Sequence, residues 1–137
     1  MGYPGETLDD LKATVAFIKW QEDVLMERYL KNSRSWNLAS EAINKNMFVA
    51  TAYPGTEMFN DPQVRKALSD GFGIKYHNGK PLCDSSLESY VEQLNDATDL
   101  IQTLDGSLLQ YSKMADSLFL EIRDILNNGN IFDILDL

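Results

Sequence analysis

The sequence predicts a mostly helical α/β fold in which one or two short parallel strands are followed by helices. Periodic apolar stripes over residues 8–29 and 112–127 indicate two long amphipathic helices. A short apolar run at residues 47–52 indicates a strand that is buried on both faces. Because a helix separates this run from the start of the chain, the strand is expected to need a parallel partner, and residues 1–3 are the upstream candidate.

Length and composition limit the function classes. The chain has 137 residues, 44% of them hydrophobic, which favours one folded domain over disorder. Twenty-one acidic and twelve basic side chains give a net charge of −9, which disfavours binding to nucleic acid and to anionic membranes. No apolar run approaches the roughly 18 residues that span a bilayer, and no secretory signal is recognisable, so a cytoplasmic location is expected. Cys83 is the only cysteine, which excludes an internal disulfide and a metal cluster held by several thiolates of one chain.

The first predicted helix follows a turn at residues 1–6 that is rich in glycine and proline. Thr7 is expected to cap it, with Asp9 and Asp10 near the positive end of the helix dipole. Residues 36–43 predict a second, shorter helix. The apolar positions that recur at helical spacing in the first helix are Leu8, Leu11, Val15, Ile18, Leu25 and Tyr29.

The middle of the chain predicts two further helices. Asp61 followed by Pro62 indicates a helix to about residue 69. Residues 74–86 are expected to form a surface loop with a turn at residues 77–79. Ser85 or Ser86 is expected to cap the next helix. Its apolar face is expected to carry Tyr90, Val91, Leu94, Ala97, Ile101 and Leu104.

The C-terminal third of the chain contains residues that typically start or end helices. Asp105 and Gly106 are expected to close the preceding helix. Ser112 then opens the final clear helix, which Gly129 ends. The tail at residues 131–137 alternates apolar and acidic residues and is expected to dock or to fray.

Two similar turn motifs frame the predicted strand. Gly2-Tyr3-Pro4-Gly5-Glu6-Thr7 precedes the first helix, and Thr51-Ala52-Tyr53-Pro54-Gly55-Thr56-Glu57 follows the apolar run. Glycine lets the backbone approach a ligand, and proline fixes the turn. In this order, joined by a helix and a short strand, the motifs resemble the last two strand–helix units of radical S-adenosylmethionine (SAM) enzymes. The similarity is closest to the subgroup that often carries a cobalamin-binding domain.

The resemblance implies a fold and a site. Residues 1–59 would be the last strand–helix units of a partial (βα)6 TIM-like barrel, and residues 60–137 a helical C-terminal extension. Loops after the strand ends build the active site in such barrels. The resemblance implies that the first turn, formed by Gly2, Tyr3, Pro4, Gly5 and Glu6, lies beside the ribose and adenine of SAM. It also implies that backbone groups of Thr51, Ala52 and Tyr53 bind the adenine edge, and that Glu6 holds its turn together rather than transferring protons.

The resemblance also implies cofactors and partners. The parent enzyme would cleave SAM reductively at a [4Fe-4S] cluster and start radical chemistry on an unspecified substrate. The resemblance allows for cobalamin in the parent enzyme but does not require it. The cluster cysteines belong near the first strand of the barrel, so this chain is expected to be inactive alone, with no catalytic residue or metal ligand of its own. Met1 is expected to be an internal methionine of a longer coding sequence, or the start of a split or truncated gene. The expected partner is the missing N-terminal part of the barrel or a second copy of the chain. The link between the motifs is longer than the usual crossover, and residues 30–46 are expected to be a helical insertion.

Each of these features also has a purely structural interpretation. Pro-Gly turns often lead into helices without binding a ligand, and Glu6 lies where acidic residues compensate a helix dipole. His77 is expected to be a solvated turn residue, because a metal site needs three or four ligands. Trp20 lies at helical spacing, which favours a core or interface role over base stacking. The competing function is therefore a non-catalytic acidic helical interaction module. A Cys-x-x-x-Cys-x-x-Cys segment encoded upstream would favour the enzyme.

Overall fold

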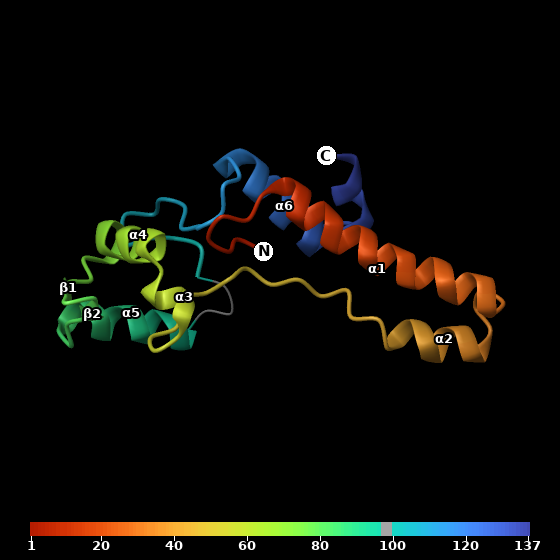
Figure 1. The fold of residues 1–137 in the computed structure, drawn as a ribbon, viewed down its shortest axis with the longest axis horizontal. Coiled ribbons are helices and arrows are strands. Elements are labelled where there is room, and N and C mark those ends of the chain that lie inside the picture. Colours follow the sequence, from red (N-terminus) through yellow and green to blue (C-terminus); the bar gives the residue numbers. More distant parts are fainter. Residues whose placement is uncertain (97–99) are drawn as a thin grey trace. The chain divides into compact units, whose positions relative to one another are not determined.

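The structure is a computed structural model that describes residues 1–96 and 100–137. Helices predominate, and the regular sheet in this described part is a two-stranded antiparallel hairpin. The chain forms two compact units (Figure 1). One unit consists of Met1–Glu6 with Phe48–Asp116, and the other of Thr7–Met47 with Ser117–Leu137.

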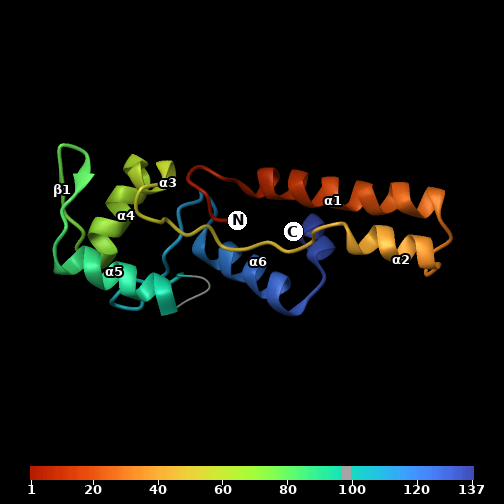
Figure 2. The ribbon, with the colours of Figure 1, turned by 90° about the horizontal axis from the view of Figure 1, so that it is seen from below.

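The unit that contains Thr7–Met47 is organised around helix α1, Leu8–Arg28. Thr7 caps α1 as predicted: its hydroxyl accepts from the Asp10 N–H, and the Asp10 carboxylate accepts from the Thr7 N–H. Helix α2, Arg34–Glu41, runs beside α1 (Figure 2). The 3-10 helix η1, Ile131–Asp136, also packs on α1. The α1 side chains buried in this packing are Leu11, Val15 and Ile18.

Helix α6, Asp116–Asn128, begins four residues later than the Ser112 start that the sequence predicts. Side-chain hydrogen bonds explain the difference. The Gln110 amide donates to the Met114 carbonyl at 2.9 Å, and the Ser112 hydroxyl accepts from the Met114 N–H at 3.2 Å. These bonds satisfy backbone groups in a non-helical arrangement. The tail does not fray, because Ile131 and Ile134 are buried.

In the other unit, the described residues form helices α3, α4 and α5 and the hairpin. Helix α4 starts after Asp61, whose carboxylate accepts from two helix N–H groups, and ends at Gly73 with a φ of 71°. The predicted start of α4 is therefore confirmed. The elements are α3 (Glu57–Asn60), α4 (Pro62–Phe72), β1 (Tyr76–His77), β2 (Lys80–Pro81) and α5 (Ser85–Asp96).

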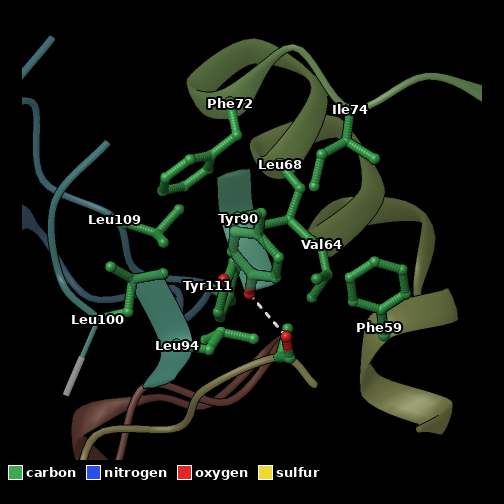
Figure 3. Packing of buried hydrophobic residues seen from close by; sticks show 11 residues of the cluster. Phe59, Val64, Leu68, Phe72, Ile74, Tyr90, Leu94, Leu100, Leu109 and Tyr111 are labelled. Carbon is green, nitrogen blue, oxygen red and sulfur yellow. Dashed lines mark hydrogen bonds between the residues drawn. The ribbon is translucent and has the colours of Figure 1, made fainter. Parts of the chain in front are cut away.

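Tyr90 lies at the centre of the core of this unit (Figure 3). Its ring packs against Phe72 and Phe59, with centroid distances of 5.0 Å and 6.2 Å. Burying each large apolar side chain contributes roughly 1.5–3 kcal/mol. The buried cluster is Ala52, Phe59, Val64, Leu68, Phe72, Ile74, Tyr90, Leu94, Leu100, Leu109 and Tyr111.

Residues 47–52 do not form the predicted regular strand, and in residues 1–96 and 100–137 the regular sheet is the antiparallel hairpin rather than the parallel strands of a barrel. The Met1 amino group donates to the Phe48 carbonyl, and the Ala50 N–H donates to the Met1 carbonyl, both at 2.7 Å. This is the hydrogen-bond pattern of a single parallel bridge between Met1 and Val49. Residues 1–3, the upstream candidate, therefore lie beside this run, but neither stretch is a regular strand, because the turn that begins at Tyr3 leaves too few residues for a longer ladder.

The helix predicted to reach Leu104 is described as far as Asp96, and Ala97 lies outside the described residues. Residues 100–104 are not helical. From residue 100 the chain instead folds back on itself. The Leu109 N–H donates to the Ile101 carbonyl at 2.7 Å. The Asp105 carboxylate accepts from the Thr103 hydroxyl at 2.5 Å and from the Ser107 N–H at 2.9 Å. These local bonds stabilise a turn against helix continuation.

The loop expected at residues 74–86 contains the hairpin of β1 and β2. Its turn lies at the predicted position, with φ values of 50° at Asn78 and 75° at Gly79, as a two-residue hairpin turn requires. The cap of α5 is Asp84 rather than Ser85 or Ser86, because the Asp84 carboxylate accepts from the Ser86 N–H. None of the helices in the described part of the chain combines the length and apolar character needed to cross a membrane.

Candidate functional site

The first turn motif forms a closed β-turn. The Glu6 N–H donates to the Tyr3 carbonyl at 3.0 Å, and Gly5 has a φ of +81°. Proline at the second position and a glycine with positive φ at the third are typical of a type II turn. The Glu6 carboxylate accepts from the Gly2 N–H at 2.5 Å. This bond ties the two ends of the motif together, in agreement with the structural role expected for Glu6.

The second turn motif has the same backbone form. The Thr56 N–H donates to the Tyr53 carbonyl at 3.2 Å, and Gly55 has a φ of +90°. The Thr56 hydroxyl donates to the same carbonyl at 2.8 Å and accepts from the Phe59 N–H at 3.2 Å. Thr56 therefore closes the turn and caps helix α3.

The bridge between Met1 and Val49 relates the two turns in space. Tyr3 follows Met1 by two residues, and Tyr53 follows Val49 by four. Because the paired segments run parallel, both chains leave the bridge at the same end. The structure thus brings the Gly2–Glu6 turn and the Tyr53–Thr56 turn to one end of the paired segments.

Both turns present accessible backbone and aromatic surface. The side chains of Tyr3 and Tyr53 are 56% and 50% exposed. A Cβ atom added to Gly5 or Gly55 would meet nothing within 4 Å. Glycine is therefore required at these positions by the backbone conformation, and the space over both turns is open. Such a surface suits a flat, polar-edged ring that stacks on tyrosine and bonds to main-chain groups.

Each turn is held by a hydrogen bond from a distant part of the sequence. The Tyr90 hydroxyl donates to the Ala52 carbonyl at 2.6 Å. The Lys113 N–H donates to the Glu6 carbonyl at 2.8 Å. Burial raises the pKa of the Tyr90 hydroxyl well above its usual value, and burial also raises the pKa of Tyr111 to about 12. Both hydroxyls are therefore protonated at neutral pH.

Comparisons with models of protein families, with curated proteins and with solved structures find no match to this chain. The resemblance to radical SAM enzymes therefore rests on the two turn motifs and on the elements that join them.

Of the two cofactors that the resemblance implies, SAM and a [4Fe-4S] cluster, the residues of this chain suit only SAM. The open space over Gly5 and Gly55 is compatible with an adenine and ribose held by main-chain groups. A [4Fe-4S] cluster does not fit, because its protein ligands are several thiolates and the chain has one, the exposed Cys83. His77 is the exposed last residue of strand β1, next to the hairpin turn. Within residues 1–96 and 100–137, no three His, Cys, Asp or Glu side chains are grouped to hold a metal ion.

Other residues depart from what the sequence indicated. Trp20 is 58% exposed and stacks on Phe17 with ring centroids 5.7 Å apart, so it is not a core residue. The sequence placed Tyr90 on the apolar face of its helix but did not identify its bond to Ala52. One signal was available: a tyrosine hydroxyl on an otherwise apolar buried face needs a hydrogen-bond partner.

Proposed function

We propose that residues 1–59 form the adenine and ribose side of a SAM site in a radical SAM core. One observation carries the proposal: two Tyr-Pro-Gly turns of the same backbone form leave a parallel bridge at the same end. Active sites of parallel barrels are built from the loops at this end of the strands. On this proposal the two segments are the last strands of a partial barrel, and residues 60–137 are its helical extension.

The proposal assigns different tasks to the site residues. Tyr3, Pro4 and Gly5 lie beside the ribose, and Gly2 with Glu6 keeps their turn closed. The Ala52 carbonyl already accepts from Tyr90, so adenine recognition falls to backbone groups of Thr51 and Tyr53. A carbonyl there would accept from the exocyclic amino group, and an N–H would donate to a ring nitrogen. Stacking on an exposed tyrosine ring would add about 1–3 kcal/mol.

The chemistry of SAM cleavage is assigned to a partner. A [4Fe-4S] cluster supplies the electron in radical SAM enzymes, and this chain has a single thiol. The N-terminal part of a barrel, or a second copy of the chain, would complete the site. In this arrangement the residues of this chain bind and orient the adenosyl group, and the substrate of the radical chemistry remains unspecified.

The test is a titration of the isotopically labelled chain with S-adenosylhomocysteine, followed by NMR. Amide signals of residues 2–6 and 51–56 are expected to shift. Gly55→Ala should abolish these shifts, because a side chain at a φ of +90° strains the turn. Gly106→Ala is the matched control, since Gly106 has a φ of +85° in a different turn and open space around it. Shifts that are absent, or confined to other residues, would contradict the proposal.

The second candidate function is an acidic helical interaction module without a cofactor. The stacked Phe17 and Trp20 favour it, because their side chains are 57% and 58% exposed on α1. On this alternative both Pro-Gly turns serve only to direct the chain into helices. Loss of a binding partner on Trp20→Ala, with no response of the turns to S-adenosylhomocysteine, would favour the module.

A further inference from the structure

One buried hydrogen bond ties the second turn motif to helix α5. The Tyr90 hydroxyl donates to the Ala52 carbonyl at 2.6 Å, between residues 38 positions apart in the sequence (Figure 3). Tyr90 and Ala52 both have an exposed fraction of 0%. Water therefore does not replace the hydroxyl easily, and a buried carbonyl without a partner costs about 1–3 kcal/mol. The bond fixes the direction in which the Ala52 carbonyl points.

The donor is held as firmly as the acceptor. The Tyr90 ring makes an edge contact with Phe72 at 5.0 Å and 68°, and a tilted contact with Phe59 at 6.2 Å. Its helix contributes Leu94 to the same buried cluster. A ring packed on several sides leaves its hydroxyl little freedom to turn away from Ala52.

Peptide geometry transmits this constraint to Tyr53. The Ala52 carbonyl and the Tyr53 N–H belong to one planar trans peptide unit, in which they point in opposite directions. Because Tyr90 draws the carbonyl toward the core, the Tyr53 N–H is directed away from the core. That N–H belongs to the residue that opens the second Tyr-Pro-Gly turn, where the side chain is half exposed.

We infer that Tyr90 is a positioning residue that, through the Ala52 carbonyl, aims the Tyr53 N–H at the adenine ring of a bound adenosyl ligand. The inference rests on the proposed function, which it deepens. Tyr90 does not touch the ligand, because it is fully buried. Tyr90 links the helical extension to the site, because α5, which lies outside residues 1–59, fixes the orientation of the backbone N–H that binds adenine.

The test compares Tyr90→Phe with two control variants of the full chain. Tyr90→Phe keeps the ring and removes the hydroxyl. Tyr76→Phe removes another hydroxyl that packs against the same cluster and has no hydrogen-bond partner within residues 1–96 and 100–137. Leu94→Ala weakens the cluster while it keeps the Tyr90 hydroxyl. For each variant the Tyr53 amide signal and its hydrogen exchange are measured by NMR, and the affinity for S-adenosylhomocysteine is measured by titration below the unfolding temperature.

Tyr90→Phe is expected to shift the Tyr53 amide signal, to accelerate its exchange and to weaken S-adenosylhomocysteine binding about tenfold. Tyr76→Phe and Leu94→Ala are expected to leave the Tyr53 signal unchanged and the affinity within about twofold of that of the original chain. The inference is overturned if Tyr90→Phe changes neither, or if Leu94→Ala reproduces both changes. If the original chain does not bind the probe while Tyr90→Phe still shifts the Tyr53 amide, the proposed function fails and the positioning of the backbone by Tyr90 stands.

Discussion

Thr103 makes several contacts in the turn after residue 100. Its hydroxyl donates to the Asp105 carboxylate at 2.5 Å, and its N–H donates to the Ser107 carbonyl at 2.9 Å. Its methyl group lies against helix α4, where a Cβ atom added to Gly71 would come within 2.5 Å of it. One small side chain thus closes a turn and limits the residue type on a neighbouring helix.

Gly71→Ala is expected to lower the free energy of unfolding by about 1–3 kcal/mol, because the added methyl group overlaps Thr103. In an unobstructed helix the same change would instead stabilise the protein by about 1 kcal/mol. The double variant Gly71→Ala with Thr103→Ser removes the obstructing methyl group, keeps the hydroxyl and should recover most of the loss. Urea unfolding measures both effects. A single variant more stable than the original chain would show that Thr103 moves aside freely.

Asp105 is expected to make the turn sensitive to acid. Hydrogen bonds, first from the Thr103 hydroxyl and then from Ser107, lower its pKa from 3.8 to about 2. Since the pKa is depressed in the folded state, the stabilisation is present above about pH 4 and is lost as the pH falls toward 2. An NMR titration of the carboxyl group should give the low value in the original chain and in Thr103→Ser. Thr103→Val should move it back toward 3.8, and an unchanged value in that variant would exclude the hydroxyl as the cause.

Helices α1 and α4 were predictable because their signals are local. Thr7 and Asp61 mark the starts of these helices, and Gly73 marks the end of α4. Side-chain hydrogen bonds around Thr103 and Gln110 explain why one helix stops early and another starts late. The apolar run at residues 47–52 was interpreted as a strand. How many of its residues pair depends on residues 1–3, which are far away in the sequence.

Removal of the α1 cap is expected to lower stability. Thr7→Ala removes the hydroxyl of the capping box and should cost about 1 kcal/mol. Thr14→Ala is the control, since its hydroxyl donates to the Asp10 carbonyl in the exposed middle of the helix. Alanine there should be neutral or slightly stabilising. Thermal unfolding followed by circular dichroism measures both; equal losses would mean that the cap contributes nothing specific.

The compact units are formed by contacts between segments that lie far apart in the sequence. Each compact unit combines two separate stretches of sequence. In the unit that contains Met1–Glu6, the bonds from the Ala50 N–H to the Met1 carbonyl and from the Lys113 N–H to the Glu6 carbonyl join the two stretches. For the candidate site, sequence motifs were sufficient to predict both Tyr-Pro-Gly turns. Residues 1–3 were expected beside the apolar run, but the limit of this pairing to Met1 and Val49 and the contact of Tyr90 were not identified, since no local pattern encodes such details.

The chain alone is expected neither to hold a [4Fe-4S] cluster nor to cleave SAM. A radical SAM cluster needs three cysteine thiolates from the protein, and Cys83 supplies one. Anaerobic reconstitution with iron and sulfide, absorption spectroscopy and an assay for 5′-deoxyadenosine test this. Activity restored by an added N-terminal barrel portion would support the proposed function, whereas a cluster with SAM cleavage in this chain alone would contradict it.

The division of each unit between two stretches also sets the order in which the protein is assembled during synthesis. Residues 7–47 emerge early from the ribosome, but the stretch that completes their unit, residues 117–137, emerges only after all of residues 48–116. Synthesis proceeds at roughly 5–20 residues per second. The apolar face of α1 therefore stays uncovered for several seconds before η1 packs on it. During that interval Leu11, Val15 and Ile18 offer chaperones and proteases a surface that the finished fold conceals.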